Sequence, residues 1–138
     1  MQQKMETIRI PESRVRVTLA ILTPPLLLGM ALLTLAVESP IAVPIVFGIL
    51  GTLLGIVVIF DFPLAVDLTD LGLVRVCLAR RHQVRWENVA AIIKPKRRGL
   101  VLVTTARKRH VLIDRILEPS ERTALMSIGD EHDIQVEL

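Results

Sequence analysis

A single apolar run dominates the chain and contains only one residue that can ionise. The run extends from Val17 to Phe60, 44 residues, and that one residue is Glu38. Glu38 separates residues 17–37 from residues 40–60, and each part is close to the roughly 20 residues that a helix needs to cross a hydrocarbon core of about 30 Å. A carboxylate is costly inside a bilayer, so Glu38 belongs at a water interface. The sequence "ESP", with its turn at residues 38–39, is therefore predicted to be the tip of a transmembrane helical hairpin.

Two alternatives fit the apolar run less well. A hairpin of core helices in a soluble protein can also be apolar on every side, but the rest of the chain is too short to surround two helices of this length. A secretory signal peptide has an apolar region of roughly 7–15 residues, and no A-x-A cleavage pattern precedes "ESP". We therefore expect a membrane protein.

The basic residues beside the run predict its orientation. Residues 1–16 contain four Lys and Arg residues against two acids, the tip contains no Lys or Arg, and residues 61–138 are rich in both. Because basic residues accumulate on the cytoplasmic side, both chain ends are expected there, in a multi-pass protein of the cell (plasma) membrane. The expected organisation is a cytoplasmic segment 1–16, a hairpin 17–60 and a cytoplasmic domain 61–138. The single cysteine, Cys77, excludes an internal disulfide.

Two features inside the run concern helix packing. Consecutive prolines at positions 24 and 25 predict a bend near Thr23, because proline frees a carbonyl inside a helix. The second span carries three glycines at helical spacing, which are Gly48, Gly51 and Gly55. Small residues in this pattern allow helices to approach closely. The glycines either pack the two spans together, pair two protomers in a homo-oligomer, or have no specific role.

Residues 61–138 change to short alternating segments. Six of them are expected as strands: "PLAVDLTD", "LVRVCLA", "HQVRW", "NVAAII", "LVLVTT" and "HVLID". Alternation places Val74, Val76 and Leu78 on one face of the second segment, and Val84 and Trp86 on one face of the third. Tight turns between successive strands predict an antiparallel sheet or partial barrel.

A helix is expected after the strands, in "EPSERTALMSIG". Pro119 suits its first turn, Leu125 and Ile128 form its apolar stripe, and Gly129 is expected just after its end. "DIQVEL" is expected as a short extended tail. The predicted fold class is α+β, with a helical hairpin followed by a small sheet that the carboxy-terminal helix closes.

The order of these elements resembles the bacterial pleckstrin-homology-like (PH-like) domains of small membrane proteins. The resemblance runs through "DLTDLGLVRV", "HQVRWENVAAI" and "GLVLVTTARKRHVLI", with a T-x-x-G-L turn at Thr69–Leu73 and an apolar-x-W-x-x-apolar segment at Val84–Val89. It covers about Arg14 to His132 and implies a cytoplasmic interaction or scaffolding module. A full domain of this family has seven strands before its helix, whereas only six are evident here. Either "ETIRIPES" returns to the sheet as a further strand, or the domain is truncated.

Basic residues are concentrated in three of the predicted turns, "ARRH" and "KPKRRG" at one end of the sheet and "ARKR" at the other. Residues 75–115 contain twelve Lys and Arg residues against two acids, whereas residues 116–138 contain one Arg and six acids. In a simple meander, one end of the sheet would carry the turns that contain Arg80, Arg81, Lys94, Lys96, Arg97 and Arg98. These turns either contact anionic membrane lipids, dock an acidic partner, or are only solvated.

Other classes of function find little support in the sequence. Aromatic residues make up 3% of the chain and Tyr is absent, so no stacking platform for nucleic acid is expected. The three histidines, His82, His110 and His132, lack metal-ligand spacing, and His110 with Asp114 is expected to be a solvated surface pair. We expect a non-enzymatic membrane protein without cofactor, metal or catalytic residues. The alternative is an accessory subunit of a larger membrane protein complex.

Overall fold

The computed structural model describes residues 6–96 and 99–138 and divides into two compact units. The hairpin unit comprises Arg14–Phe62 together with the short segment Cys77–Arg80. The sheet unit comprises the chain up to Ser13, Pro63–Val76 and Arg81–Leu138. The predicted segment 1–16 is thus divided between the two units.

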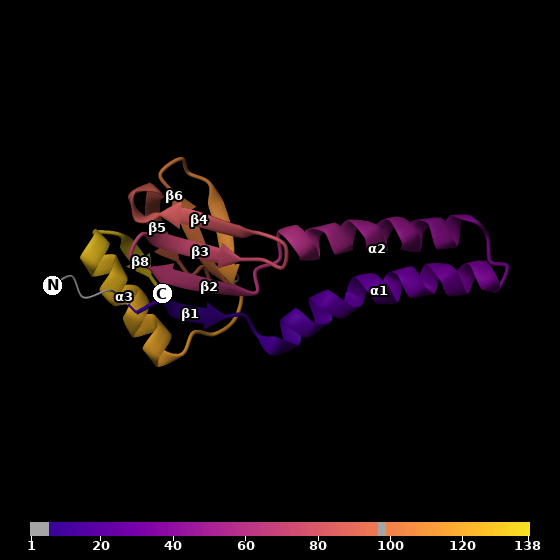
Figure 1. Ribbon diagram of the computed structural model, residues 1–138, viewed down its shortest axis with the longest axis horizontal. Helices are drawn as coiled ribbons and strands as arrows, with labels where there is room; N and C mark the ends of the chain where they lie inside the picture. Colours follow the sequence, from indigo (N-terminus) through magenta and orange to yellow (C-terminus); the bar gives the residue numbers. More distant parts are fainter. Residues whose placement is uncertain (1–5, 97–98) are drawn as a thin grey trace. The chain divides into compact units, whose positions relative to one another are not determined.

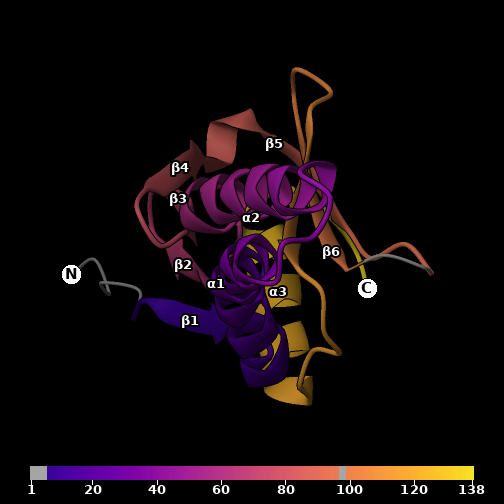
Figure 2. The same cartoon turned by 90° about the vertical axis from the view of Figure 1, so that its right-hand side faces the viewer.

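Two long helices form the hairpin unit. They are α1 (Arg14–Ala36) and α2 (Ala42–Phe60), and Figures 1 and 2 show them side by side. The predicted helical hairpin is confirmed, with α1 beginning three residues earlier and α2 two residues later than expected. At the tip, Glu38 has a left-handed backbone with φ of 54°, and the Ser39 backbone N–H donates to the Thr34 carbonyl at 3.2 Å. This geometry ends α1 and turns the chain.

The two prolines lie inside α1, where neither can donate a backbone hydrogen bond. Figure 1 shows α1 changing direction in its first half. Next to the prolines, the Thr23 hydroxyl donates to the Leu19 carbonyl at 2.6 Å. The bend follows from the missing N–H groups.

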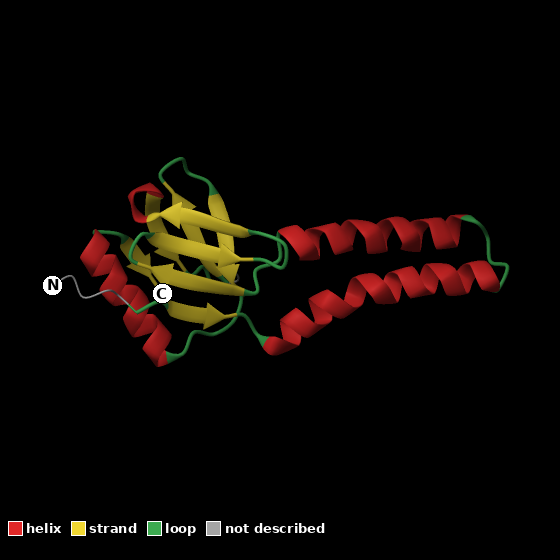
Figure 3. Ribbon diagram, viewed as in Figure 1, coloured by secondary structure: helices red, strands yellow, loops and turns green. Residues whose placement is uncertain are grey.

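Eight strands in two sheets form the framework of the sheet unit (Figure 3). The first sheet has the order β1-β2-β3-β4 and the second the order β7-β6-β5-β8. Their bounds are β1 (Ile8–Pro11), β2 (Ala65–Thr69), β3 (Gly72–Val76), β4 (Arg81–Arg85), β5 (Val89–Ile93), β6 (Leu100–Thr104), β7 (Arg109–Ile113) and β8 (Gln135–Glu137). A short 3₁₀ turn, η1 (Trp86–Asn88), separates β4 from β5, so the expected single bent sheet is instead two sheets.

Strand β1 precedes the hairpin in the chain, whereas its partner strand β2 follows the hairpin. It pairs antiparallel with β2, with Ile8 opposite Leu68 and Pro11 opposite Ala65. Of the two alternatives for "ETIRIPES", the structure therefore shows the returning strand. Among the described residues, seven strands precede α3 (Pro119–His132).

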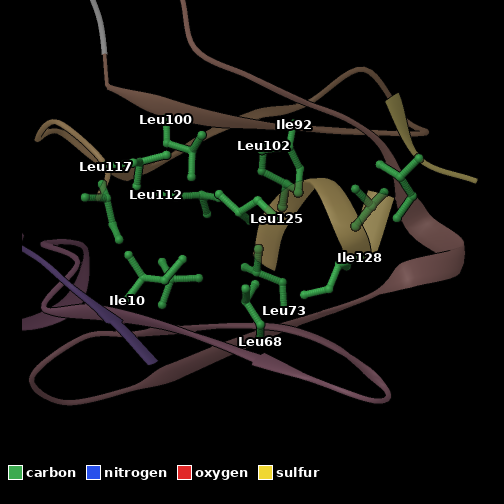
Figure 4. Close-up of a cluster of buried hydrophobic side chains, with 14 of the residues drawn as sticks. Ile10, Leu68, Leu73, Ile92, Leu100, Leu102, Leu112, Leu117, Leu125 and Ile128 are labelled. Carbon is green, nitrogen blue, oxygen red and sulfur yellow. The ribbon is translucent and has the colours of Figure 1, made fainter. Parts of the chain in front are cut away.

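The core of the sheet unit lies between the two sheets and α3. Leu68 and Leu73 come from the first sheet, Leu102 from the second, and Leu125 and Ile128 from α3, and all are at most 2% exposed. Figure 4 shows these side chains pointing toward one another. Both residues of the predicted α3 stripe are therefore core residues, and Trp86, at 6% exposed, is buried as expected.

The apolar face that alternation indicated in β3 is not the face that packs into the core. The register places Leu73 opposite Leu68, so Leu73 faces the core. Val74 and Val76 are only half-buried, and Leu78 lies beyond the strand with 56% of its surface exposed. Side chains alternate along a strand, so Arg75 shares the face of Leu73.

The predicted end of α3 was also wrong. The helix continues three residues past Gly129, and Asp133, with φ of 54°, supplies the left-handed cap. Gly129 instead lies against β8. A Cβ placed at Gly129 would be only 2.5 Å from Cγ2 of Val136 in that strand. Strand β8, which confirms the expected extended tail, pairs parallel with β5.

Candidate functional site

One of the predicted basic turns lies against the end of α2, within the hairpin unit. The backbone N–H of Ala79 donates to the carbonyl of Ile59 at 3.0 Å. The guanidinium of Arg80 pairs with the carboxylate of Asp61 at 3.0 Å, in a pair that is exposed on both sides. The turn Cys77–Arg80 is thus hydrogen-bonded to the last turn of the second apolar helix.

The turn Cys77–Arg80 exposes one apolar and one basic side chain. The backbone N–H of Cys77 donates to the Arg80 carbonyl at 2.9 Å, which closes the turn. Cys77 is buried, whereas Leu78 at the tip is exposed. The carbonyls at a helix C-terminus carry partial negative charge, and the cation of Arg80 near the end of α2 complements it. We call the exposed pair Leu78 and Arg80 the interface turn.

The other predicted basic residues belong to the sheet unit. Arg81 opens β4, while Lys94 follows β5 and donates its backbone N–H to the Glu137 carbonyl at 2.8 Å. The backbone N–H of Asp114, after β7, donates to the carboxylate of Glu12, after β1, at 2.9 Å. This bond joins the end of β1 in the first sheet to the end of β7 in the second.

Three residues of the predicted basic turns remain, and the structure describes only one of them, Lys96. Lys96 is exposed in the β5–β6 turn. Arg97 and Arg98 lie outside the described residues. The "ARKR" turn is at the other end of the second sheet, where Thr104 pairs with Val89. The structure therefore places Arg80 in the hairpin unit, Arg81 in the first sheet, and Lys94 and Lys96 after β5 of the second sheet.

The three glycines of α2 have different surroundings. A Cβ at Gly51 would lie 3.0 Å from Cγ of Leu28 and 3.2 Å from Cβ of Leu27, so α1 packs closely there. A Cβ at Gly55 would lie 3.7 Å from Pro24, in ordinary contact. A Cβ at Gly48 would meet nothing within 4 Å. Two of the glycines thus face α1, and the third faces open space.

Both helices of the hairpin are long and apolar enough to cross a membrane. Only 11% of the most apolar 18-residue stretch of each helix is buried within the described residues. Most of their Leu, Ile and Val side chains are therefore exposed. An exposed apolar surface of this extent indicates contact with lipid or with other apolar helices.

Two features of the sheet unit were not evident from the sequence. Glu12 is a buried acid, at 5% exposed, and its partner is a backbone N–H that no sequence pattern identifies. The imidazole of His110 lies beside that of His82, with ring centroids 5.7 Å apart. In β4, His82 and Val84 are two residues apart and therefore share a face of the strand. This spacing is a signal that could have predicted His82 on the core-facing side.

The described residues contain no group of three His, Cys, Asp or Glu side chains that could hold a metal ion. Comparisons of the chain with protein-family models, with curated protein sequences and with solved structures found no match.

Proposed function

We propose that this chain is an integral membrane protein whose hairpin crosses the membrane twice and whose sheet unit is a cytoplasmic interaction module. The interface turn, Leu78 and Arg80, is proposed to rest in the inner headgroup layer. In this proposal the protein is not an enzyme and needs no cofactor. The module binds anionic lipid or an acidic partner rather than nucleic acid.

The exposure of the hairpin supports the membrane crossing. A core helix of a soluble protein is mostly buried, whereas α1 and α2 leave most of their apolar side chains uncovered. A secretory signal has one short apolar region, but here a second apolar helix of 19 residues follows the first. Length, composition and exposure together favour two spans.

The pairing of β1 with β2 supports the topology. These strands flank the hairpin in the chain and are hydrogen-bonded in one sheet. A hairpin that crosses a bilayer must therefore return to the side from which it started. The flanks carry the basic residues and the tip at Glu38 carries none, so the positive-inside rule assigns the flanks to the cytoplasm.

The proposed lipid contact rests on the hydrogen bond from the Ala79 backbone N–H to the Ile59 carbonyl. It fixes the turn at the level of the last turn of α2, where an apolar span ends. Leu78 is exposed at this level and Arg80 is 56% exposed on its side chain. An apolar side chain beside a basic one suits the boundary between acyl chains and headgroups, where each Lys or Arg contributes about 1 kcal/mol of attraction to anionic lipid.

The resemblance to bacterial PH-like domains supports the proposed role of the sheet unit. The described residues contain seven strands before α3, as that family requires, with the quoted motifs in the same order. Arg81, Lys94 and Lys96 give the sheet unit basic side chains suited to anionic lipid or an acidic partner. This part of the proposal concerns a class of role and not a ligand.

Depth measurements on the full chain in vesicles test the proposed contact. Leu78→Cys and Leu71→Cys, each in a Cys77→Ala background, carry a fluorophore in turns at opposite ends of β3, and both leucines are exposed. We expect nitroxide-labelled lipids to quench the label at position 78 strongly and that at position 71 weakly. Anionic lipid should increase the difference, and Arg80→Gln should reduce it. Equal quenching at both positions would contradict the lipid contact.

Cysteine labelling in intact cells tests the crossing separately. Ser39→Cys in the same background should react with a membrane-impermeant maleimide added outside. Lys96→Cys should react only after the membrane is opened. Reaction of both residues from outside, or of neither, would contradict the proposed topology.

A second candidate function is that of an accessory subunit in a membrane complex, and the open surroundings of Gly48 favour it. A helix of a partner protein could approach α2 closely at Gly48, because small residues permit close helix contact. Gly48→Leu should then reduce the amount of any partner that copurifies from native membranes, whereas Ile49→Leu on the next exposed position should not.

A further inference from the structure

Polar side chains occupy core-facing positions at one side of the sheet unit. In the first sheet, Val66 pairs with Arg75, which pairs with His82. Directly paired residues share a face of a sheet, and Val66 is 1% exposed, so Arg75 and His82 are on the core-facing side. In the second sheet, His110 pairs with Leu102, which is also 1% exposed. Three basic or titratable side chains thus replace apolar ones between the sheets.

The two histidines meet across the gap between the sheets. The rings of His82, on β4, and His110, on β7, have centroids 5.7 Å apart and an interplanar angle of 69°. His82 is exposed and His110 is half-buried. The pair therefore lies where the apolar core gives way to solvent.

A cavity of about 420 Å³ opens beside this pair. Its size falls within the range of small-molecule sites. The polar groups among its lining residues are those of His82, Gln83, Asn88, Thr104, Thr105, Lys108 and His110. They include an ammonium, two imidazoles, two amides and two hydroxyls, and the described lining contains no Asp or Glu.

Hydrogen bonds hold the β6–β7 wall of the cavity in place. The Thr105 backbone N–H donates to the Asn88 carbonyl at 2.9 Å, which ties the turn to η1. The backbone N–H of Lys108 donates to the Thr104 hydroxyl at 3.1 Å, and that of Thr104 donates to the Lys108 carbonyl at 2.9 Å. The backbone of this wall is therefore held in place, which reduces the entropy cost of ordering it when a ligand binds.

The electrostatic potential in this cavity is positive. Burial lowers the pKa of His110, and the charges of His82, Arg75 and Lys108 lower it further. These groups face His110 from β4, from β3 and from the β6–β7 turn. An anion in the cavity would oppose all three charges and favour protonation of His110.

We propose that this cavity is a binding site for a phosphate group, in which His82, His110 and Lys108 donate hydrogen bonds to its oxygens. The phosphate belongs either to a small soluble phosphate ester or to a lipid headgroup. The site shares no residue with the interface turn, Leu78 and Arg80, so it can be tested separately from the lipid contact proposed for that turn. Metal binding is the less suitable chemistry, because two imidazoles lack a third ligand among the described residues.

Histidine titration by NMR tests the proposal on the full chain in neutral nanodiscs. The chain has three histidines, and His132, stacked on Trp86 with centroids 5.1 Å apart, provides an internal control. Inorganic phosphate is the first probe, at constant ionic strength set with chloride. We expect phosphate to raise the pKa of His110 and to shift the ring resonances of His82, and to leave the resonances of His132 unchanged.

Two variants in one turn separate specific binding from general charge. Lys108→Gln should weaken phosphate binding about tenfold, the effect of losing a charge-assisted hydrogen bond. Arg107→Gln removes the same charge from a neighbouring residue that does not line the cavity, and it should change the affinity less than about twofold. Equal losses in both variants would contradict the site, and the wild-type titration remains decisive if either variant fails to fold.

A second series of nanodiscs distinguishes the source of the phosphate. If nanodiscs with phosphatidic acid or phosphatidylglycerol shift His82 and His110 without added phosphate, the ligand is a headgroup. If only free phosphate shifts them, the ligand is a soluble ester. Response to neither, or to Zn²⁺ alone, would overturn the proposal.

Discussion

The carboxylate of Glu12 accepts a hydrogen bond from the backbone N–H of Asp114 at 2.9 Å, across 102 residues of sequence. Its other oxygen accepts the backbone N–H of Ser13 at 2.8 Å. Glu12 is 5% exposed, so this is a buried connection between the segment that enters α1 and the end of β7. Residues 8–12 are therefore an integral part of the sheet unit.

Replacing Glu12 by Ala should destabilise the sheet unit by about 1–3 kcal/mol, because buried N–H groups lose their acceptor. Trp86 is the only Trp in the chain, and its fluorescence reports unfolding of this unit. Glu6→Ala removes an exposed acid from the same segment and should change stability by less than about 0.5 kcal/mol. Equal effects of the two variants would show that the buried bond contributes nothing.

The pair of Arg115 and Glu121 predicts a dependence of stability on pH. Two guanidinium nitrogens of Arg115 donate to the Glu121 carboxylate, which also accepts the backbone N–H of Glu118 at 2.8 Å. Burial alone would raise the pKa of Glu121, but these hydrogen bonds and the charge of Arg115 outweigh it, so the pKa is lowered.

A lowered carboxylate pKa stabilises the folded state above the unfolded pKa, and this contribution is lost as the pH falls through the folded pKa. The wild type should therefore exceed Glu121→Gln in stability at neutral pH, and the difference should shrink below about pH 4.5. Denaturant unfolding followed by Trp86 fluorescence at several pH values measures it. Glu131→Gln, on an exposed position of the same helix, is the control. A difference that is constant with pH would contradict the assignment.

Local patterns predicted much of this fold, whereas contacts distant in sequence were missed. Glu38 identified the tip of the hairpin because one charge inside a long apolar run is a signal that can be read from the local sequence. The sequence left it undecided whether β1 joins the sheet, because its partner β2 follows the whole hairpin in the chain. The four residues of β1 include Arg9, whose guanidinium pairs with Asp67 at 2.8 Å, so the charge has a cross-strand partner that sequence alone does not show.

The cavity could not be predicted from the sequence, because its lining residues come from β4, η1 and the β6–β7 region, which only the tertiary fold brings together. Alternation also did not show which face of β3 is buried. The register that pairs Leu73 with Leu68 makes the core-facing side the one that carries Arg75, and not the one that carries Val74. A shift of one residue moves every side chain to the other face, so the sequence did not show that Arg75 faces the same side as His82.

The different surroundings of Gly51 and Gly48 predict different responses to a larger side chain. Gly51→Val should destabilise the hairpin by about 1–3 kcal/mol, because its Cβ alone would lie 3.0 Å from Leu28. Gly48→Val adds the same atoms in open space and should have little effect. Hydrogen exchange of the α2 amides in bicelles should accelerate only for Gly51→Val. A stronger effect at Gly48 would instead indicate that a second copy or another helix packs there.

Gly129 provides the last prediction, because its role differs from that of an ordinary helix residue. Replacing Gly by Ala inside a helix usually stabilises it by about 0.5–1 kcal/mol. Here the added Cβ would lie 2.5 Å from Cγ2 of Val136 and 3.0 Å from the Ile134 carbonyl oxygen, so β8 must move away from α3. Gly129→Ala should therefore lower the melting temperature followed by Trp86, whereas Ser127→Ala, on an exposed position of α3, should not. Val136→Ala removes the clashing methyl groups, so the double variant should be less destabilised than the sum of the two single variants. A rise in melting temperature for Gly129→Ala alone would show that β8 does not pack on α3 as described.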